Sequence, residues 1–205
     1  MSHQTPSVLL LVVGMQNDKY RPVVALPNET CLSQESIHQI ITSTHLLTKV
    51  NECITAARER AWKVVFALDL HHPKHASFQT RPPHCVMQTW GADVVRGLQF
   101  GFDTSDLVYR GLDKDKDSDD AFYVSVPGSP SHLRFLMSEQ QATTLCLCGA
   151  SPDGCIEQTA RTASLLGYKP LIISDCSVLL STTATTPHYS TLSTLLHHYA
   201  PILEG

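Results

Sequence analysis

The chain has 205 residues, of which 42% are hydrophobic and 17% charged, so it can bury one sizeable core and has none of the composition of a disordered or fibrous protein. Its formal net charge of -4 at pH 7 gives no global electrostatic reason to expect nucleic acid or an anionic membrane as a partner. We therefore expect one globular domain over residues 1–205.

The expected location is intracellular. The first apolar run, Val8–Val13, is short and follows no basic segment, which is typical of a strand and not of a signal peptide. No later stretch is long enough to span a bilayer. Seven cysteines, an odd number, argue against a disulfide framework and for a reducing compartment. The cytoplasm is the expected compartment, with the mitochondrion left open.

Strand-like and helix-like segments alternate along the chain. In order, the sequence predicts strand Val8–Val13, helix Ser33–Ala57, strand Lys63–Leu68, strand Asp106–Tyr109, strand Thr143–Cys148, helix Asp153–Leu166, strand Lys169–Ser174 and helix Tyr189–Tyr199. This alternation favours a three-layer α/β fold: a doubly wound parallel sheet with helices on both faces and the first strand central. Binding sites in such sheets lie at the carboxyl ends of the strands.

A histidine-rich segment follows the second predicted strand. Asp69 and His71 are two residues apart, so in an extended segment their side chains point the same way and can share one cation, with His75 and His84 as further ligands. One carboxylate with two or three imidazoles suits zinc or iron, and manganese less well. The competing interpretation is a set of polar surface residues, since the chain has 11 histidines.

Cys155 lies where the fourth predicted strand turns into a helix. Backbone N–H groups and the helix dipole at such a turn stabilise a thiolate and can bind an oxyanion. The alternative is a small packing residue, which is the interpretation preferred for the cysteines inside predicted strands and helices or without a spaced partner: Cys31, Cys53, Cys146, Cys148 and Cys176. Cys85, beside His84, stays open between the two.

The acidic and basic run Asp113–Asp120 invites comparison with a calcium-binding loop. It lacks the glycine at the sixth position and the glutamate at the twelfth that such a loop requires, so it predicts a solvated loop.

Five ordered segments resemble the nicotinamidases, members of the isochorismatase-like cysteine hydrolases. Gly14–Asp18 is similar to the family's opening motif, Asp69–Phe78 to its metal loop, and Pro82–Val86 with Gly91–Asp93 to the segment that supplies a further histidine. Arg110–Gly111 with Asp117–Phe122 resembles the lysine tract, and Gly149–Cys155 with Thr159–Ala160 and Gly167–Tyr168 resembles the nucleophile region. The resemblance implies substrate contacts from Ala150, Ser151 and Gly154, and a cis peptide between Ala150 and Ser151.

The resemblance also implies a catalytic Asp-Lys-Cys triad, of which this chain keeps only the cysteine. The matching positions are Gly14, Arg110 and Cys155. Glycine cannot move a proton, and the rigid guanidinium of arginine does not replace a compact ammonium. The family's aromatic walls around the substrate ring correspond to Lys19 and Arg81. Where the family has two aromatic side chains and an acid, this chain thus has two cations and a glycine.

Three hypotheses follow from these departures. The first is a catalytically impaired pseudoenzyme, acting as a structural or interaction subunit of a homo-oligomer or larger assembly, with a divalent metal, zinc above all, retained at Asp69, His71 and His84. The second is an active metal-dependent cysteine amidohydrolase acting on nicotinamide or another small amide. The third is a small-anion-binding module built on Lys19, Arg81 and Arg110.

Overall fold

The computed structural model describes residues 7–20, 45–101, 106–112, 115, 118, 120–123, 131–151, 154–179 and 188–198. These residues build one six-stranded sheet, in which every pair of neighbouring strands is parallel. The strands are β1 (Ser7–Val13), β2 (Lys63–Asp69), β3 (Leu107–Arg110), β4 (Ala142–Ser151), β5 (Lys169–Leu179) and β6 (His188–Ser190), in the spatial order β3-β2-β1-β4-β5-β6. The predicted parallel α/β sheet with β1 in its interior is confirmed.

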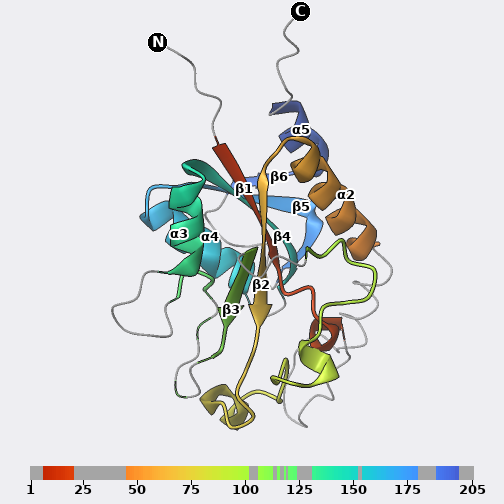
Figure 1. The fold of residues 1–205 in the computed structure, drawn as a ribbon, viewed down its shortest axis with the longest axis vertical. Helices are drawn as coiled ribbons and strands as arrows, with labels where there is room; N and C mark the ends of the chain where they lie inside the picture. The colour runs from red at the N-terminus through yellow and green to blue at the C-terminus, as the bar shows by residue number, and fades with distance from the viewer. Residues whose placement is uncertain are drawn as a thin grey trace, which may run out of the picture.

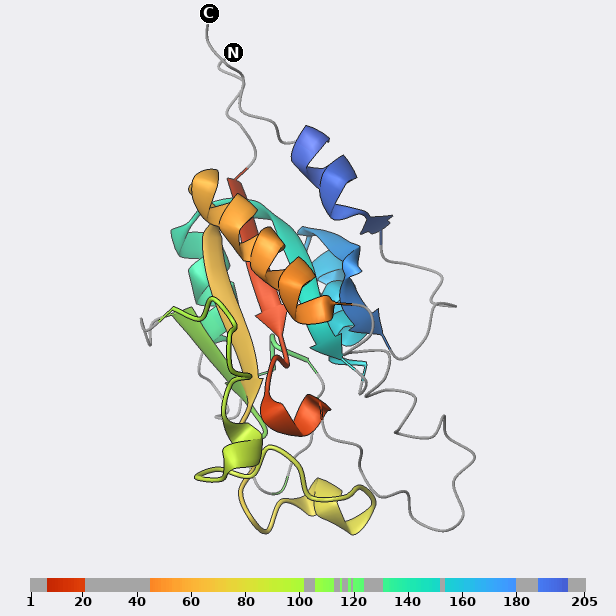
Figure 2. The ribbon, with the colours of Figure 1, turned by 90° about the vertical axis from the view of Figure 1, so that its right-hand side faces the viewer.

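Helices cover both faces of this sheet (Figure 1). The α-helices are α2 (Leu46–Glu59), α3 (His132–Glu139), α4 (Cys155–Leu165) and α5 (Leu192–His198). Figure 2 shows α2 and α5 against one face, while α3 and α4 lie against the other. Three 3₁₀ helices, η1 (Asn17–Tyr20), η2 (Ala76–Gln79) and η3 (Trp90–Ala92), lie beyond the carboxyl end of β2 in Figure 1.

The three layers follow from the period of two in β1. Successive side chains of a strand point to opposite faces, so a continuous apolar run serves two cores. In one cluster Val8, Leu10 and Val12 pack with residues of α2 and α5. In the other, Leu9, Leu11 and Val13 pack with residues of α3 and α4.

Several element boundaries differ from the sequence expectation. The helix expected from Tyr189 begins only at Leu192, because His188–Ser190 pair with Leu171–Ile173 as β6. Helix α3 was not predicted, and β4 and β5 run past Cys148 and Ser174 because they resume pairing after a register shift. Helix α2 begins at Leu46, after His45 in a left-handed conformation, so the prediction of one helix running through this point from Ser33 is wrong; Ser33 itself lies outside the described residues. Helix α4 begins at Cys155 with Gly154 as its N-cap, whereas Asp153, the predicted first residue, lies outside the described residues.

The sheet reverses its winding direction between β1 and β4. From β1 the chain moves outward to β2 and β3, and from β4 it moves the other way to β5 and β6. In open α/β sheets such a reversal leaves a crevice at the carboxyl ends of the two strands, where ligands bind. Among the described residues, no helix has both the length and the apolar character that crossing a membrane requires.

Candidate functional site

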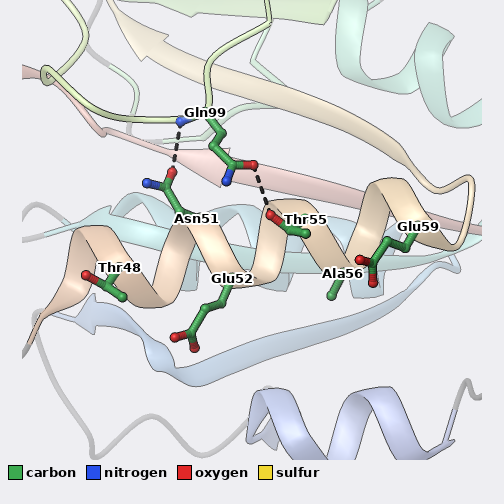
Figure 3. A pocket seen from close by; sticks show the side chains of 7 residues that line it. All are labelled: Thr48, Asn51, Glu52, Thr55, Ala56, Glu59 and Gln99. Carbon is green, nitrogen blue, oxygen red and sulfur yellow. Dashed lines mark hydrogen bonds between the residues drawn. The ribbon is translucent and has the colours of Figure 1, made fainter.

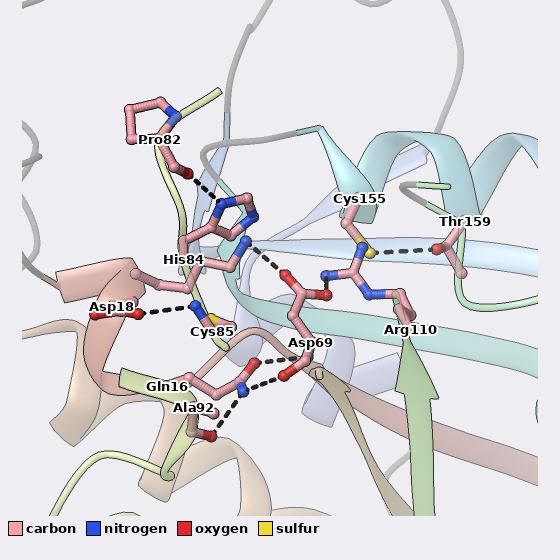
Figure 4. A network of polar contacts seen from close by, with 11 residues as sticks. Gln16, Asp18, Asp69, Pro82, His84, Cys85, Ala92, Arg110, Cys155 and Thr159 are labelled. Atoms are coloured by element: carbon pink, nitrogen blue, oxygen red, sulfur yellow. Dashed lines mark hydrogen bonds and ion pairs between the residues drawn. The ribbon is translucent and has the colours of Figure 1, made fainter. Parts of the chain in front are cut away.

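Four of the residues singled out in the sequence lie at the carboxyl edge of the sheet. Gly14 follows β1 directly, Asp69 and Arg110 are the last residues of β2 and β3, and Cys155 begins α4 shortly after β4 ends. Asp69 and Arg110 are partners in the β2–β3 register. Figure 4 shows the Asp69 and Arg110 side chains joined at this edge, with Cys155 drawn beside them at the start of its helix.

Asp69 forms ion pairs with two cations. The Lys19 Nζ lies 2.7 Å from one carboxylate oxygen of Asp69, and the Arg110 guanidinium pairs with the other. All three residues are buried, with 2%, 7% and 4% of Asp69, Lys19 and Arg110 exposed. Buried charges persist only when they are paired. Among these three side chains the cations outnumber the carboxylate by one, and the Asp18 carboxylate, which accepts the Cys85 N–H, is a further negative charge in the same neighbourhood.

Gln16 fixes the backbone at Asp69. Its side-chain amide donates to the Asp69 carbonyl at 2.7 Å and to the Ala92 carbonyl at 2.8 Å, and its side-chain oxygen accepts the Asp69 N–H at 2.7 Å. The opening motif contains this glutamine, but the sequence alone gave it no role. The available signal was a glutamine directly after a predicted buried strand, where a polar side chain needs partners on another segment; in the structure Gln16 is fully buried.

Asp69, His71 and His84 form a candidate metal site. One ligand atom from each lies within 4.8 Å of the others. Among the described residues, neither buried ring nitrogen of His71 has a hydrogen-bond partner. Burial, as the largest cause, lowers the pKa of His71 to about 4, so its imidazole is neutral at neutral pH. Neutral imidazole is the form that binds metals, so these residues fit a divalent cation.

Hydrogen bonds distinguish the two outer histidines. His84 Nδ1 lies 3.0 Å from the carbonyl oxygen of Pro82, which can only accept, so Nδ1 carries the proton and Nε2 presents a lone pair. His75 Nδ1 instead accepts the backbone N–H of Ser77 at 3.2 Å. His75 lies outside the three-residue cluster, with its ring centroid 4.6 Å from that of His71. The arrangement favours His75 as a neighbour of the site.

Two glycines are required by close contacts around this edge. Gly14 has φ +62° and donates its N–H to the Ala67 carbonyl; a Cβ there would come well inside 3.0 Å of the Ala150 carbonyl oxygen. Gly111 has φ +74°, and a Cβ there would come well inside 3.0 Å of the His71 ring. In this structure, residue 14 therefore has no space for the side chain of a proton carrier.

Cys155 is fully buried at the first residue of α4, after Gly154 in a left-handed conformation with φ 85°. Its Sγ lies 3.7 Å from the hydroxyl of Thr159, one turn along the helix. That hydroxyl oxygen accepts the Ala121 N–H at 2.9 Å, which leaves the Thr159 proton free to point at the sulfur. The described cysteines have no disulfide and are all buried, including Cys85, whose N–H donates to the Asp18 carboxylate.

The remaining residues expected to contact substrate differ in their surroundings. Lys19 and Ala150 are buried, whereas the Arg81 side chain is exposed. The expectation of a cis peptide between Ala150 and Ser151 is wrong, because the described residues contain none. Both residues continue β4 and pair with Val178 and Leu179, which an extended trans chain satisfies. Of the charged run at 113–120, Asp115 is exposed, and most of the rest lies outside the described residues.

A separate surface pocket of about 380 Å³ lies on α2 (Figure 3). It is lined by Thr48, Asn51, Glu52, Thr55, Ala56, Glu59 and Gln99. None of the residues singled out in the sequence lines it. The backbone N–H of Gln99 donates to the Asn51 side-chain oxygen, and the Thr55 hydroxyl donates to the Gln99 side-chain oxygen. These bonds tie the polar face of the helix to the neighbouring loop.

Comparison with known proteins assigns the family. The model of the isochorismatase domain matches residues 8–204. The nicotinamidase of Saccharomyces cerevisiae is 22% identical over 197 residues, 81% of this chain and 85% of that protein. The zinc complex of Pyrococcus horikoshii pyrazinamidase is 25% identical with a TM-score of 0.67, covering 86% of this chain and 89% of that one. An isochorismatase-like hydrolase from Alkaliphilus metalliredigens is 20% identical with a TM-score of 0.68, covering 94% and 99%. With a family match over nearly its whole length, this chain belongs to the isochorismatase family.

Proposed function

We propose that this chain hydrolyses a small, negatively charged amide, with Cys155 as the nucleophile and a divalent metal of the zinc type at Asp69, His71 and His84. The observation that carries the proposal is the position of the Cys155 thiol at the first residue of α4, at the carboxyl edge that also holds the Asp-His-His cluster. The nicotinamidase and zinc-bound pyrazinamidase relatives support the same reaction class.

The Cys155 sulfur has an environment suited to a nucleophile. The amino-terminal end of a helix favours a thiolate, and the Thr159 hydroxyl at 3.7 Å can donate to it. In the reaction the sulfur bonds to the amide carbon, the C–N bond breaks, and the amine leaves with a proton. Water then hydrolyses the thioester to release the acid and restore the thiol.

The departing amine needs a proton that residue 14 cannot deliver. With glycine there, the thiol proton must travel to the amine through water, which makes this step slow. Removal of one member of a catalytic triad leaves a deficit of about ten-thousand-fold or more. A metal bound by Asp69, His71 and His84 would supply Lewis acidity at this edge.

The charges around Asp69 support an anionic substrate. The two cations Lys19 and Arg110 are matched by the carboxylates of Asp69 and Asp18, so a bound divalent metal would give this edge an excess of positive charge. A neutral pyridine ring gains nothing from this field, whereas a carboxylate is attracted by it. Nicotinamide is therefore not the expected substrate.

A second candidate, the non-catalytic binding protein, is favoured by one observation. The backbone of Gly14 leaves no room for a side chain, so the absence of the acid is built into the fold at this position. In this alternative the metal and the cations hold a ligand or stabilise a subunit, and no bond is cleaved.

Ammonia release by the metal-replete protein separates these candidates. We expect slow release from succinamate, a carboxylate-bearing amide, none above background from nicotinamide, and none from either with Cys155→Ala. Metal-bound protein that turns over neither substrate would favour the binding protein. Turnover of nicotinamide at about one per second or faster, an ordinary enzyme rate, would contradict both the anion preference and the second candidate.

A further inference from the structure

We infer that Lys19 is an internal cation that competes with the divalent metal for the carboxylate of Asp69, so that the Lys19–Asp69 ion pair and the bound metal are alternative states of the site. This inference rests on the proposed metal site and adds a residue that controls its affinity.

The contact between Lys19 and Asp69 is close and shielded from water. The Lys19 Nζ lies 2.7 Å from Asp69 Oδ2, and the two side chains are 5% and 3% exposed. Water and salt screen such a pair much less than a surface pair. The ammonium therefore places a full positive charge against one of the oxygens that a metal would use.

The other carboxylate oxygen is also occupied. Arg110, at the end of β3, pairs with Asp69 Oδ1. A divalent cation that joins Asp69, His71 and His84 would thus add two positive charges beside a carboxylate that two cations already contact. Like charges this close repel one another strongly where water does not screen them, so a bound metal favours movement of one cation away from Asp69.

Lys19 is the cation better able to leave. A lysine ammonium is a compact charge on a flexible four-carbon stem. Arg110, by contrast, ends β3 as the register partner of Asp69 on β2, which holds its backbone beside that carboxylate. Lys19 belongs to the short η1 segment, and its Cγ would lie 3.8 Å from a Cβ placed on Gly14. Its stem thus runs past the bare Cα of Gly14 on its way to Asp69.

Metal binding should accordingly break the Lys19–Asp69 ion pair. The affinity of the wild-type site is lower than its three ligands would give alone, because part of the binding free energy is spent on moving the ammonium away from Asp69. Removing the charge of Lys19 removes this competition and leaves Arg110 to pair with the carboxylate in the metal-free state.

The test is zinc titration of the metal-stripped full chain by isothermal calorimetry. We expect Lys19→Met to bind zinc at least about tenfold more tightly than wild type, a change of the size that residues contacting metal ligands produce. Lys19→Arg, which keeps the charge on a less mobile side chain, should show no gain in zinc affinity over wild type. Lys63→Met is the matched control, because it removes a lysine that pairs with Asp106 away from the cluster.

Thermal unfolding provides a second readout. Without metal, Lys19→Met should melt below wild type, because Asp69 has lost one of its two cations; with excess zinc, its melting temperature should rise by more than that of wild type. Lys19→Gln serves in the same way should the methionine variant fail to fold.

Three results would overturn the inference, and the measurements distinguish them from one another. Equal or weaker zinc affinity in Lys19→Met and Lys19→Gln would mean that Lys19 does not compete, while metal binding itself stands. Absence of zinc binding in wild type and in both variants would reject the competition and the metal part of the proposed function together. Equal gains in Lys63→Met would assign the effect to overall charge.

Discussion

Gly14 has both a left-handed backbone and a crowded Cα. Its φ is +62°, and an added Cβ would come well inside 3.0 Å of the Ala150 carbonyl oxygen. Gly167 also has a positive φ, +86°, but nothing lies within 4 Å of its added Cβ. The two positions therefore separate the cost of the backbone conformation from the cost of crowding.

Gly14→Ala should reduce the free energy of unfolding more than Gly167→Ala. The conformational cost at Gly167 is about 1 kcal/mol, and forcing a methyl group against the β4 backbone at Gly14 should add about 2 kcal/mol. Urea denaturation of both variants measures the difference. Equal losses would show that the β4 backbone yields to the methyl group.

Gly111 holds open the space of the His71 ring. A Cβ at Gly111 would come well inside 3.0 Å of the ring, so Gly111→Ala must displace the imidazole. We expect zinc affinity to fall at least about tenfold, as when the support of a metal ligand is removed. Calorimetric titration measures this, with Gly167→Ala as the control that keeps its affinity. Wild-type affinity in Gly111→Ala would remove His71 from the ligand set.

At the scale of elements, four buried thiols lie in the core between α2 and the sheet. They are Cys53 of α2, Cys146 and Cys148 of β4, and Cys176 of β5. Burial raises the pKa of Cys146 to about 12. The pKa of Cys53 is raised chiefly by a hydrogen bond with Cys148, and that of Cys176 chiefly by one with Cys53. The folded protein thus keeps protons that the unfolded chain releases.

This difference in proton binding makes the fold sensitive to alkali. A thiol of the unfolded chain titrates near pH 8.5, so above that pH the unfolded state binds fewer protons and the free energy of unfolding falls by about 1.4 kcal/mol per pH unit for each thiol. Urea denaturation between pH 8 and pH 10.5 should show a smaller slope for Cys146→Ala than for wild type. Equal slopes would mean that Cys146 ionises within the folded protein.

The strands show what hydrophobic periodicity in the sequence can predict and what it cannot. The apolar run of β1 is long enough to identify a strand buried on both faces, and it proved central. Strand β6, with three residues, is too short for a periodic signal, so Tyr189 and Ser190 were assigned to the following helix. The extension of β5 to Leu179 depends on pairing with β4 after a register shift, which no local pattern encodes.

At the scale of the whole molecule, the metal site joins two stretches of the chain. Asp69 and His71 lie at and just after the end of β2, whereas His84 lies beyond η2. A ligand that binds only the folded state stabilises it by mass action, by about 2.7 kcal/mol at a hundredfold excess over the dissociation constant. Metal should therefore hold these stretches together.

Zinc at that excess should raise the melting temperature of wild type, measured by calorimetry or circular dichroism. His84→Ala should abolish the shift, because it removes a ligand. His75→Ala should retain most of it, because His75 lies outside the cluster and accepts from Ser77. Loss of the shift in His75→Ala would instead make His75 the fourth ligand.

The sequence predicted which residues lie at the same edge of the sheet, but not which contacts their side chains make. Parallel strands share one carboxyl edge, so Gly14, Asp69, Arg110 and Cys155 could be assigned to it in advance. The ion pairs of Asp69 could not, because they depend on the route of the Lys19 side chain past Gly14. The sequence also could not predict that Arg81 is exposed, since a sequence does not show which cationic side chains of a loop point inward.

The close approach of Gly14 to Ala150 also limits the order in which this site can change over evolutionary time. An aspartate introduced at residue 14 as the first step would meet the β4 backbone before the carboxylate reached any partner. A shift of the Gly149–Ser151 segment would have to come first, and that shift alone offers no gain to selection. The Lys19–Asp69 pair adds a further barrier, because a new carboxylate would draw the ammonium from its partner. The present site is thus easier to change at its exposed positions than at residue 14.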